Sequence, residues 1–146
     1  MIIPNKGKNT LDAQQIKTTP DPFEPFHIAQ GYKVGNLLFT SGQASIDKQG
    51  NILGVGDFDA QAELAFQNLN EILTLGGSNL ERVIKVTIYL TDMTNFEKVV
   101  ALRKRFFKPP YPADTTIEVT SLALPELEIE IEAVALIGGN LIEAFS

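Results

Sequence analysis

The sequence feature that most constrains the fold is the alternation of apolar and acidic side chains over residues 127–137, near the end of the chain. Such an alternation is typical of a β-strand, because successive side chains point to opposite faces of a sheet. The apolar face, which is suited to packing beneath helices, carries Leu127, Ile129, Ile131 and Ala133. The other face carries Glu126, Glu128, Glu130 and Glu132, then becomes apolar at Val134 and Leu136. A face that is part acidic and part apolar predicts contact with a second subunit.

Three short strands are predicted before the first helix. The first two cover residues 28–34 and 37–40, and Gly35 with Asn36 supplies the positive φ angles of a tight hairpin between them. The third is expected at residues 52–55, after a turn at residues 49–51. The opening of the domain is therefore predicted to be a β-meander.

The remaining pattern predicts two helices and three more strands. Asp57 or Asp59 can cap a helix over residues 60–75, and a capping-box pattern at residues 94–97 opens a second helix that ends before Pro109. Strands are expected at residues 83–90, 115–119 and 127–137. The order β-β-β-α-β-α-β-β predicts an α+β fold with both helices on one face of a mainly antiparallel sheet.

The length and the start of the chain bound the domain organisation. A chain of 146 residues fits one domain, and residues 1–26, which include four of the eight prolines, are predicted to form an extended N-terminal arm before a single domain at residues 27–146. The first residues lack the pattern of a signal peptide, and no apolar stretch approaches the ~20 residues of a membrane span. A cytoplasmic protein with no membrane partner is expected.

The residue types present exclude several kinds of chemistry. The sequence has no cysteine and one histidine, which excludes disulfides and thiolate zinc sites, and we predict neither a metal nor a cofactor. The net charge is −6, and seven acids but no Lys or Arg follow Lys108. A nucleic-acid groove requires clustered cations, so no nucleic-acid partner is expected.

Three segments of the sequence form a set whose order and spacing are specific. They are Val34-Gly35-Asn36-Leu37-Leu38-Phe39-Thr40-Ser41-Gly42-Gln43, Val83-Ile84-Lys85-Val86-Thr87-Ile88-Tyr89-Leu90-Thr91-Asp92-Met93 and Ile129-Glu130-Ile131-Glu132-Ala133-Val134-Ala135. Together they resemble the RidA (YjgF) family of imine and enamine deaminases, also called L-PSP endoribonucleases. The resemblance covers residues 30–136. It implies a chorismate-mutase-like fold, a homotrimer, and small-molecule pockets between subunits that release ammonia and a 2-oxo acid from an imine.

The resemblance also implies which residues form the site. The glutamate that positions water corresponds to Glu130, and a serine and a glycine of the pocket correspond to Ser41 and Gly42. The arginine that binds the substrate carboxylate is replaced by Asp114, next to Thr116, a further candidate for substrate binding. A pocket tyrosine is replaced by Ile28, and an asparagine of the second helix by Val100. Three polar contacts of the family site are therefore missing.

Several alternatives follow from these departures. Asp114 could bind a cationic ligand group, pair with Arg103 or Arg105, or cap the turn after Pro112. Glu130 could be a catalytic base or one acid on a solvated strand face. A deaminase that accepts a neutral or amine-bearing ligand is one hypothesis, a non-catalytic metabolite-binding or regulatory trimer is the second, and an RNA-cleaving protein is a distant third.

Overall fold

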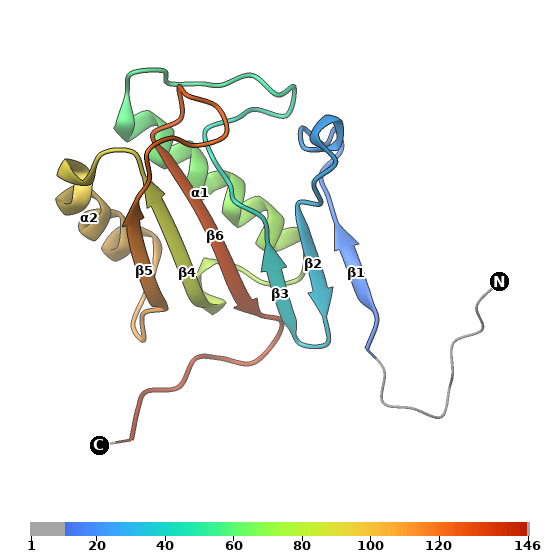
Figure 1. The fold of residues 1–146 in the computed structure, drawn as a ribbon. Coiled ribbons are helices and arrows are strands. Elements are labelled where there is room, and N and C mark those ends of the chain that lie inside the picture. Colours follow the sequence, from blue (N-terminus) through green and yellow to red (C-terminus); the bar gives the residue numbers. More distant parts are fainter. Residues whose placement is uncertain (1–10, 146) are drawn as a thin grey trace.

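A six-stranded mixed sheet forms one layer of the molecule, and the two α-helices cover one of its faces (Figure 1). The computed structural model describes residues 11–145. The strands are β1 (Ala13–Ile16), β2 (Gly31–Val34), β3 (Leu37–Thr40), β4 (Val83–Leu90), β5 (Ala113–Glu118) and β6 (Ile129–Leu136). The helices are α1 (Phe58–Leu75) and α2 (Phe96–Phe106), and three short 3₁₀ turns are η1 (Glu24–Phe26), η2 (Leu80–Arg82) and η3 (Met93–Asn95). The α+β fold with both helices on one face is confirmed.

The strands lie in the order β1-β2-β3-β6-β4-β5, which places the last strand at the centre of the sheet. All pairs are antiparallel except β4 and β5, which are parallel. The predicted alternation of β6 is confirmed, because Ile129, Ile131 and Ala135 are fully buried. Central burial between β3 and β4 explains why this strand carries the strongest pattern in the sequence.

The core lies between the helices and the inner face of the sheet. The predicted helical face is confirmed, since Ala65, Leu69 and Leu73 of α1 are fully buried. The side chain of Asp57 accepts a hydrogen bond from the backbone N–H of Ala60, so Asp57 is the N-cap of α1. Within residues 11–145, no helix is long and apolar enough to cross a membrane.

One predicted strand is wrong, and one strand was not predicted. Residues 52–55 contribute only an isolated bridge between Ile46 and Ile52, because Gly54 and Gly56 adopt positive φ angles of 71° and 77° that interrupt an extended chain. The first strand is instead β1, which lies within the predicted arm and pairs with β2. Three of its four residues are exposed, so its sequence, AQQI, carries no apolar alternation. The part of the arm at residues 1–10 lies outside the described residues.

Candidate functional site

Glu130 lies on the face of β6 that points away from the helices. Its register partner on β4 is Tyr89, and the neighbouring pairs in the same two strands, including Ile131 with Ile88, point into the core. Glu130 is half-buried rather than exposed like a solvated surface acid. Its backbone position therefore directs the carboxylate to the open face of the sheet.

The carboxylate of Glu130 borders a cavity of about 460 Å³, the Glu130 cavity. Its walls are mostly apolar and come from residues 22–28, the loop after β3 and the loop before β6. Figure 1 shows both loops at the end of the sheet where β6 begins. The lining residues are Pro22, Phe23, Phe26, Ile28, Ser41, Gly42, Ile46, Gly50, Ala123, Leu124, Leu127 and Glu130. The structure thus brings together four sequence-predicted residues, Glu130, Ser41, Gly42 and Ile28.

Gly42 allows the carboxylate to lie close against the chain. A Cβ atom at Gly42 would meet Cδ of Glu130 at 2.5 Å, closer than two such atoms can approach. Ser41 packs beside it, and both its backbone N–H and its hydroxyl donate to the carbonyl of Gln30, at 2.9 and 3.2 Å. The serine therefore joins the residue before β2 to the loop after β3, and its hydroxyl oxygen can still accept a hydrogen bond.

The electrostatic surroundings of Glu130 favour its protonated form. Burial raises the pKa of Glu130 above its ordinary value of 4.5, and the nearby charge of Glu132 raises it further. Hydrogen bonds are not among the causes of this shift. A carboxyl group with a raised pKa in a cavity is suited to exchanging protons with a ligand or with water.

The other acids of β6 have different surroundings. Glu132 accepts a hydrogen bond from the hydroxyl of Tyr89, and this bond, together with burial, raises the pKa of Tyr89 to about 12. In Glu128, Oε2 is buried and has no hydrogen-bond partner within residues 11–145. The alternation in the sequence did not distinguish Glu126, Glu128, Glu130 and Glu132 from one another. In the structure, Glu130 is the one of these four that lines the Glu130 cavity.

Asp114 is held by a cation of the second helix. Its carboxylate accepts two hydrogen bonds from Arg103 of α2, from Nε at 2.8 Å and from Nη2 at 3.0 Å. The hydroxyl of Thr116 donates to the same carboxylate at 2.8 Å. Of the alternatives for Asp114, the structure therefore shows the ion pair with Arg103, and the carboxylate is not a free anion.

A second cavity, of about 290 Å³, lies beside this ion pair between the end of α2 and the start of β5. This Asp114 cavity is lined by Val100, Arg103, Lys104, Phe107, Tyr111, Pro112 and Asp114. It contains two of the sequence-predicted residues, Val100 and Asp114, and Thr116 bonds to one of them. Arg103, the residue that fixes Asp114, was named in the sequence only as one of two possible partners.

The two cavities lie on opposite faces of the sheet. Asp114 pairs with Val86 and Thr116 with Ile88, and both partners point into the core beneath the helices. Glu130 points to the other face and pairs with Tyr89 of β4, which lies three residues along that strand from Val86, the partner of Asp114. Three residues correspond to roughly 10 Å along a strand. One chain therefore does not bring Glu130 and Asp114 into contact.

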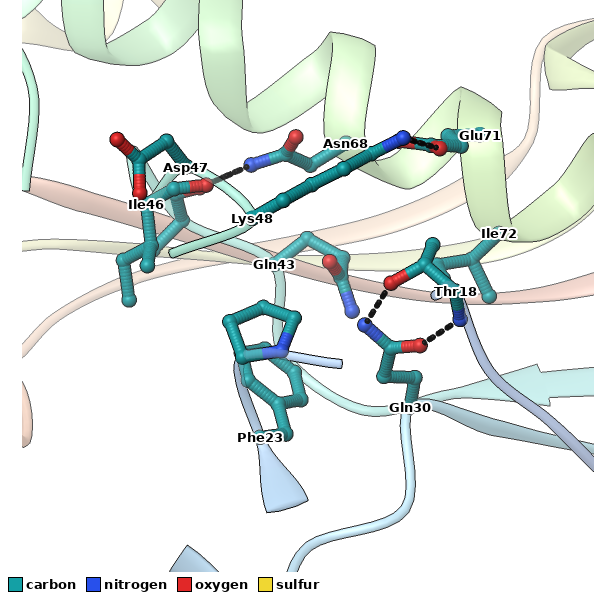
Figure 2. A pocket seen from close by; sticks show the side chains of 12 residues that line it. Thr18, Phe23, Gln30, Gln43, Ile46, Asp47, Lys48, Asn68, Glu71 and Ile72 are labelled. Atoms are coloured by element: carbon teal, nitrogen blue, oxygen red, sulfur yellow. Dashed lines mark hydrogen bonds and ion pairs between the residues drawn. The ribbon is translucent and has the colours of Figure 1, made fainter. Parts of the chain in front are cut away.

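A small polar cleft of about 20 Å³ adjoins the Glu130 cavity at Phe23 (Figure 2). At its centre Gln30 bonds twice to Thr18, accepting from its backbone N–H and donating to its hydroxyl at 3.1 Å. Asn68 of α1 donates to the carbonyls of Ala44 and Ile46 at 2.8 and 2.9 Å. Pro22, Phe23 and Ile46 line both this cleft and the Glu130 cavity.

The sequence did not point to Phe23 and Phe26 as site residues, because they lie in the proline-rich segment predicted to be an arm. The available signal was two aromatic residues spaced three apart among prolines, which is unusual for a solvated arm. Within residues 11–145, no three His, Asp or Glu side chains are grouped so that they could hold a metal ion.

Comparisons with known proteins agree with this architecture. Residues 17–137 match the family model described as Endoribonuclease L-PSP. The chain belongs to the RidA (YjgF) family. A RutC family protein of Pyrococcus horikoshii, PH0854, is 38% identical over 119 residues, which is 82% of this chain and 92% of the relative.

Other members of the RidA family match at similar coverage. The 2-iminobutanoate/2-iminopropanoate deaminase of Homo sapiens is 33% identical over 131 residues, 89% of this chain and 94% of the relative. The crystal structure of RidA from the Antarctic bacterium Psychrobacter superposes with a TM-score of 0.77 at 31% identity, covering 85% of this chain and 99% of that one.

Proposed function

We propose that this protein is a hydrolytic deaminase of imine or enamine metabolites, acting in a homotrimer whose sites are completed between subunits. The observation that carries the proposal is the half-buried carboxylate of Glu130 beside a cavity of about 460 Å³, with a pKa raised by burial. A relative from Homo sapiens is named as a deaminase of 2-iminobutanoate and 2-iminopropanoate. The chemistry therefore matches both the name of this relative and Glu130, the one ionisable residue among the described residues that line this cavity.

In the proposed reaction, ionised Glu130 accepts a proton from water while the water oxygen adds to the carbon of the protonated imine, whose positive nitrogen takes up the electron pair of the C=N π bond. The C=N double bond becomes a single bond, and the carbinolamine that forms carries one hydroxyl and one amino group. Protonated Glu130 then gives its proton to the nitrogen, the C–N bond breaks, and ammonia leaves as the C=O bond forms. The proton of the carbinolamine hydroxyl returns to the Glu130 carboxylate, which releases it to solvent. A carboxyl group with a raised pKa supports these transfers, because it is a stronger base than an ordinary glutamate and can still return the proton as an acid.

The split between the two cavities supports an assembly of several subunits. Both cavities contain residues that the family resemblance assigns to one pocket, yet they lie on opposite faces of the sheet in one chain. A second subunit that brings its Asp114 cavity against the Glu130 cavity would complete that pocket. The exposed apolar side chains of the open face, Tyr32, Phe39 and Ile117, support such a contact.

Asp114 is the basis for an altered substrate choice. In the family the equivalent arginine binds a carboxylate, whereas here the Asp114 carboxylate and the Arg103 guanidinium pair with each other. The pair offers a ligand carboxylate less attraction than a free arginine would, because its charges cancel. We therefore expect imines without a carboxylate to be hydrolysed at least as well as those that carry one.

The alternative is a non-catalytic metabolite-binding or regulatory trimer. The same ion pair favours it, because Arg103 is already committed to Asp114 and cannot orient a substrate as freely. A cytoplasmic location stays a prediction; a relative from Schizosaccharomyces pombe is named as mitochondrial. We do not propose RNA cleavage, because seven acids and no Lys or Arg follow Lys108.

The decisive experiment combines an activity panel with hybrid trimers. Imines generated from amino acids and from primary amines would be assayed with the wild type, Glu130→Gln and Val100→Trp, the last of which obstructs the Asp114 cavity at an exposed position. Each variant should be inactive alone. When the two variants are co-expressed in equal amounts, the hybrid trimers should recover about a quarter of the wild-type activity. Each site needs an intact Glu130 from one subunit and an unobstructed Asp114 cavity from its neighbour, and random assembly supplies both in about one case in four.

Two outcomes would overturn the proposal. A wild type that hydrolyses no imine faster than the background rate would exclude the deaminase and leave the non-catalytic alternative. Hybrids that stay inactive although both single variants form trimers by native mass spectrometry would exclude a site shared between subunits.

A further inference from the structure

The wall of the Glu130 cavity formed by residues 22–28 carries large apolar side chains that are unusually exposed. Phe26 is 60% exposed and Ile28 is 49% exposed, and both line the cavity together with Phe23. We propose that Phe23 and Phe26 are specificity-determining residues, which select imines carrying a branched aliphatic or aromatic substituent over those carrying a methyl group. This inference rests on the proposed function, since it names the substrate class of the same site.

The turn that presents these rings is an ordered structure. In η1 the backbone N–H of Phe26 donates to the carbonyl of Phe23 at 3.0 Å, and that of His27 donates to Glu24 at 3.1 Å. The carboxylate of Asp21 accepts from the backbone N–H of Phe23 at 2.9 Å. His27 adopts a φ of 58°, a left-handed conformation that a residue with a side chain adopts only where its surroundings require it. The chain thus bears a conformational cost to bring Ile28 round to the cavity.

Hydrogen bonds between the residues that flank this turn in the sequence, Thr18 and Gln30, also hold it in place. Gln30 is 3% exposed and Thr18 is 7% exposed, and their paired hydrogen bonds tie the two ends of the segment together beside Phe23 (Figure 2). The carbonyl of Gln30 also accepts from the backbone N–H of Ser41 at 2.9 Å. Because these groups are buried and bonded, the aromatic wall has a fixed position relative to Ser41 and therefore to Glu130.

The size and chemistry of the cavity favour a bulky apolar group. Its volume of about 460 Å³ lies within the range of roughly 300–1,000 Å³ that is common for small-molecule sites. Of its lining residues within 11–145, Glu130 alone is ionisable, and Leu124, Ala123 and Ile46 add to the apolar surface of the aromatic wall. A methyl substituent would leave most of this surface in contact with water. Each additional buried methylene should therefore raise kcat/KM about fourfold.

The experiment varies the substituent while keeping the rest of the substrate constant. One series of imines is generated in place from L-alanine, L-leucine and L-phenylalanine by an amino-acid oxidase; a second, without a carboxylate, comes from ethylamine, isobutylamine and phenethylamine by an amine oxidase. Competition with semicarbazide, which traps the free imine, gives kcat/KM. In at least one series the wild type should prefer the bulky imines over the smallest by at least about tenfold.

Phe26→Ala should lower this ratio of bulky to small substrates by at least about tenfold, and Phe23→Ala should act in the same direction. The matched control is Phe145→Ala, the same chemical change at a fully exposed position outside both cavities. It should leave the ratio unchanged. A wild type that hydrolyses the smallest imine best, or a Phe26→Ala variant that keeps the wild-type ratio, would overturn the inference.

A binding measurement separates this inference from the proposed function. Calorimetry with the oxo products, pyruvate against 4-methyl-2-oxopentanoate and acetaldehyde against isobutyraldehyde, reports selectivity without any turnover. If no imine is hydrolysed but the bulky member of a pair binds at least about tenfold more tightly and loses this advantage in Phe26→Ala, the inference stands and the deaminase fails. If imines are hydrolysed without selectivity, the inference fails and the deaminase stands.

Discussion

The Glu130 cavity and the Asp114 cavity each contain a carboxylate, but the two carboxylates are in opposite situations. Asp114 is bonded to Arg103 and Thr116, whereas Glu130 is half-buried beside apolar walls and its pKa is raised. Loss of one partner from a largely buried ion pair destabilises a fold, while a carboxylate kept in an apolar cavity costs stability and is available for chemistry. The contrast separates an acid that supports the fold from an acid with a candidate role in function.

The largest expected effect is on catalysis by the Glu130 cavity. Glu130→Gln should lower kcat/KM for imine hydrolysis by at least about 100-fold, since the amide cannot accept the proton from water. The temperature of unfolding should stay the same or rise, because a disfavoured buried charge is removed. The matched control, Glu126→Gln, changes an exposed acid of the preceding loop and should keep wild-type kinetics. A fully active Glu130→Gln variant would show that Glu130 has no catalytic role, and the contrast with Asp114 would no longer be one between function and fold.

The next effect is on the stability provided by the Asp114 pair. The side chains of Arg103 and Asp114 are 25% and 16% exposed, so loss of one partner leaves a charge that is largely buried. Asp114→Asn should lower the free energy of unfolding by about 2 kcal/mol in chemical denaturation. Arg103→Met combined with Asp114→Asn should cost less than the sum of the single changes, because the two residues interact directly.

An exposed ion pair supplies the control for this prediction. Lys98 and Asp59 pair at 3.3 Å with side chains that are 52% and 73% exposed. Lys98→Met should cost no more than about 0.5 kcal/mol, because water screens the pair. Equal losses from Lys98→Met and Asp114→Asn, or additive losses in the double variant, would show that the Asp114 pair is an ordinary surface contact.

The sequence predicted the central strand β6 and the buried face of α1 better than the exposed edge strand and the loops. The alternation of β6 and the apolar face of α1 are direct consequences of burial, and both were confirmed. The edge strand β1 was missed because an exposed strand needs no apolar pattern. The aromatic turn at residues 23–26 was missed because prolines indicated an arm, and its function as a wall depends on the loop before β6, which is distant in sequence.

The partner of Asp114 could be named from the sequence only as one of several alternatives. Choosing Arg103 requires knowing how α2 lies over β5, which is a matter of packing and not of local pattern. The separation of Asp114 from Glu130 likewise depends on the register of β5 and β6 on the two sides of β4. Neither register can be obtained from the alternation within one strand, because alternation fixes only the faces of that strand.

The smallest effect, and the one that addresses the raised pKa itself, is the pH dependence of stability. Folding raises the pKa of Glu130 above 4.5, so over the interval between its unfolded and folded pKa values the folded state binds more protons than the unfolded state. Stability from this group therefore falls as pH rises through that interval. The stability of Glu130→Gln relative to the wild type should accordingly increase from below pH 4.5 upward and become constant above the folded pKa. Val100→Ala changes no charge, so its difference from the wild type should stay level with pH. If the stability difference between Glu130→Gln and the wild type is also independent of pH, Glu130 is solvated in the assembled protein and its pKa is not raised. The contrast between the Glu130 cavity and the Asp114 cavity would then lose its electrostatic basis.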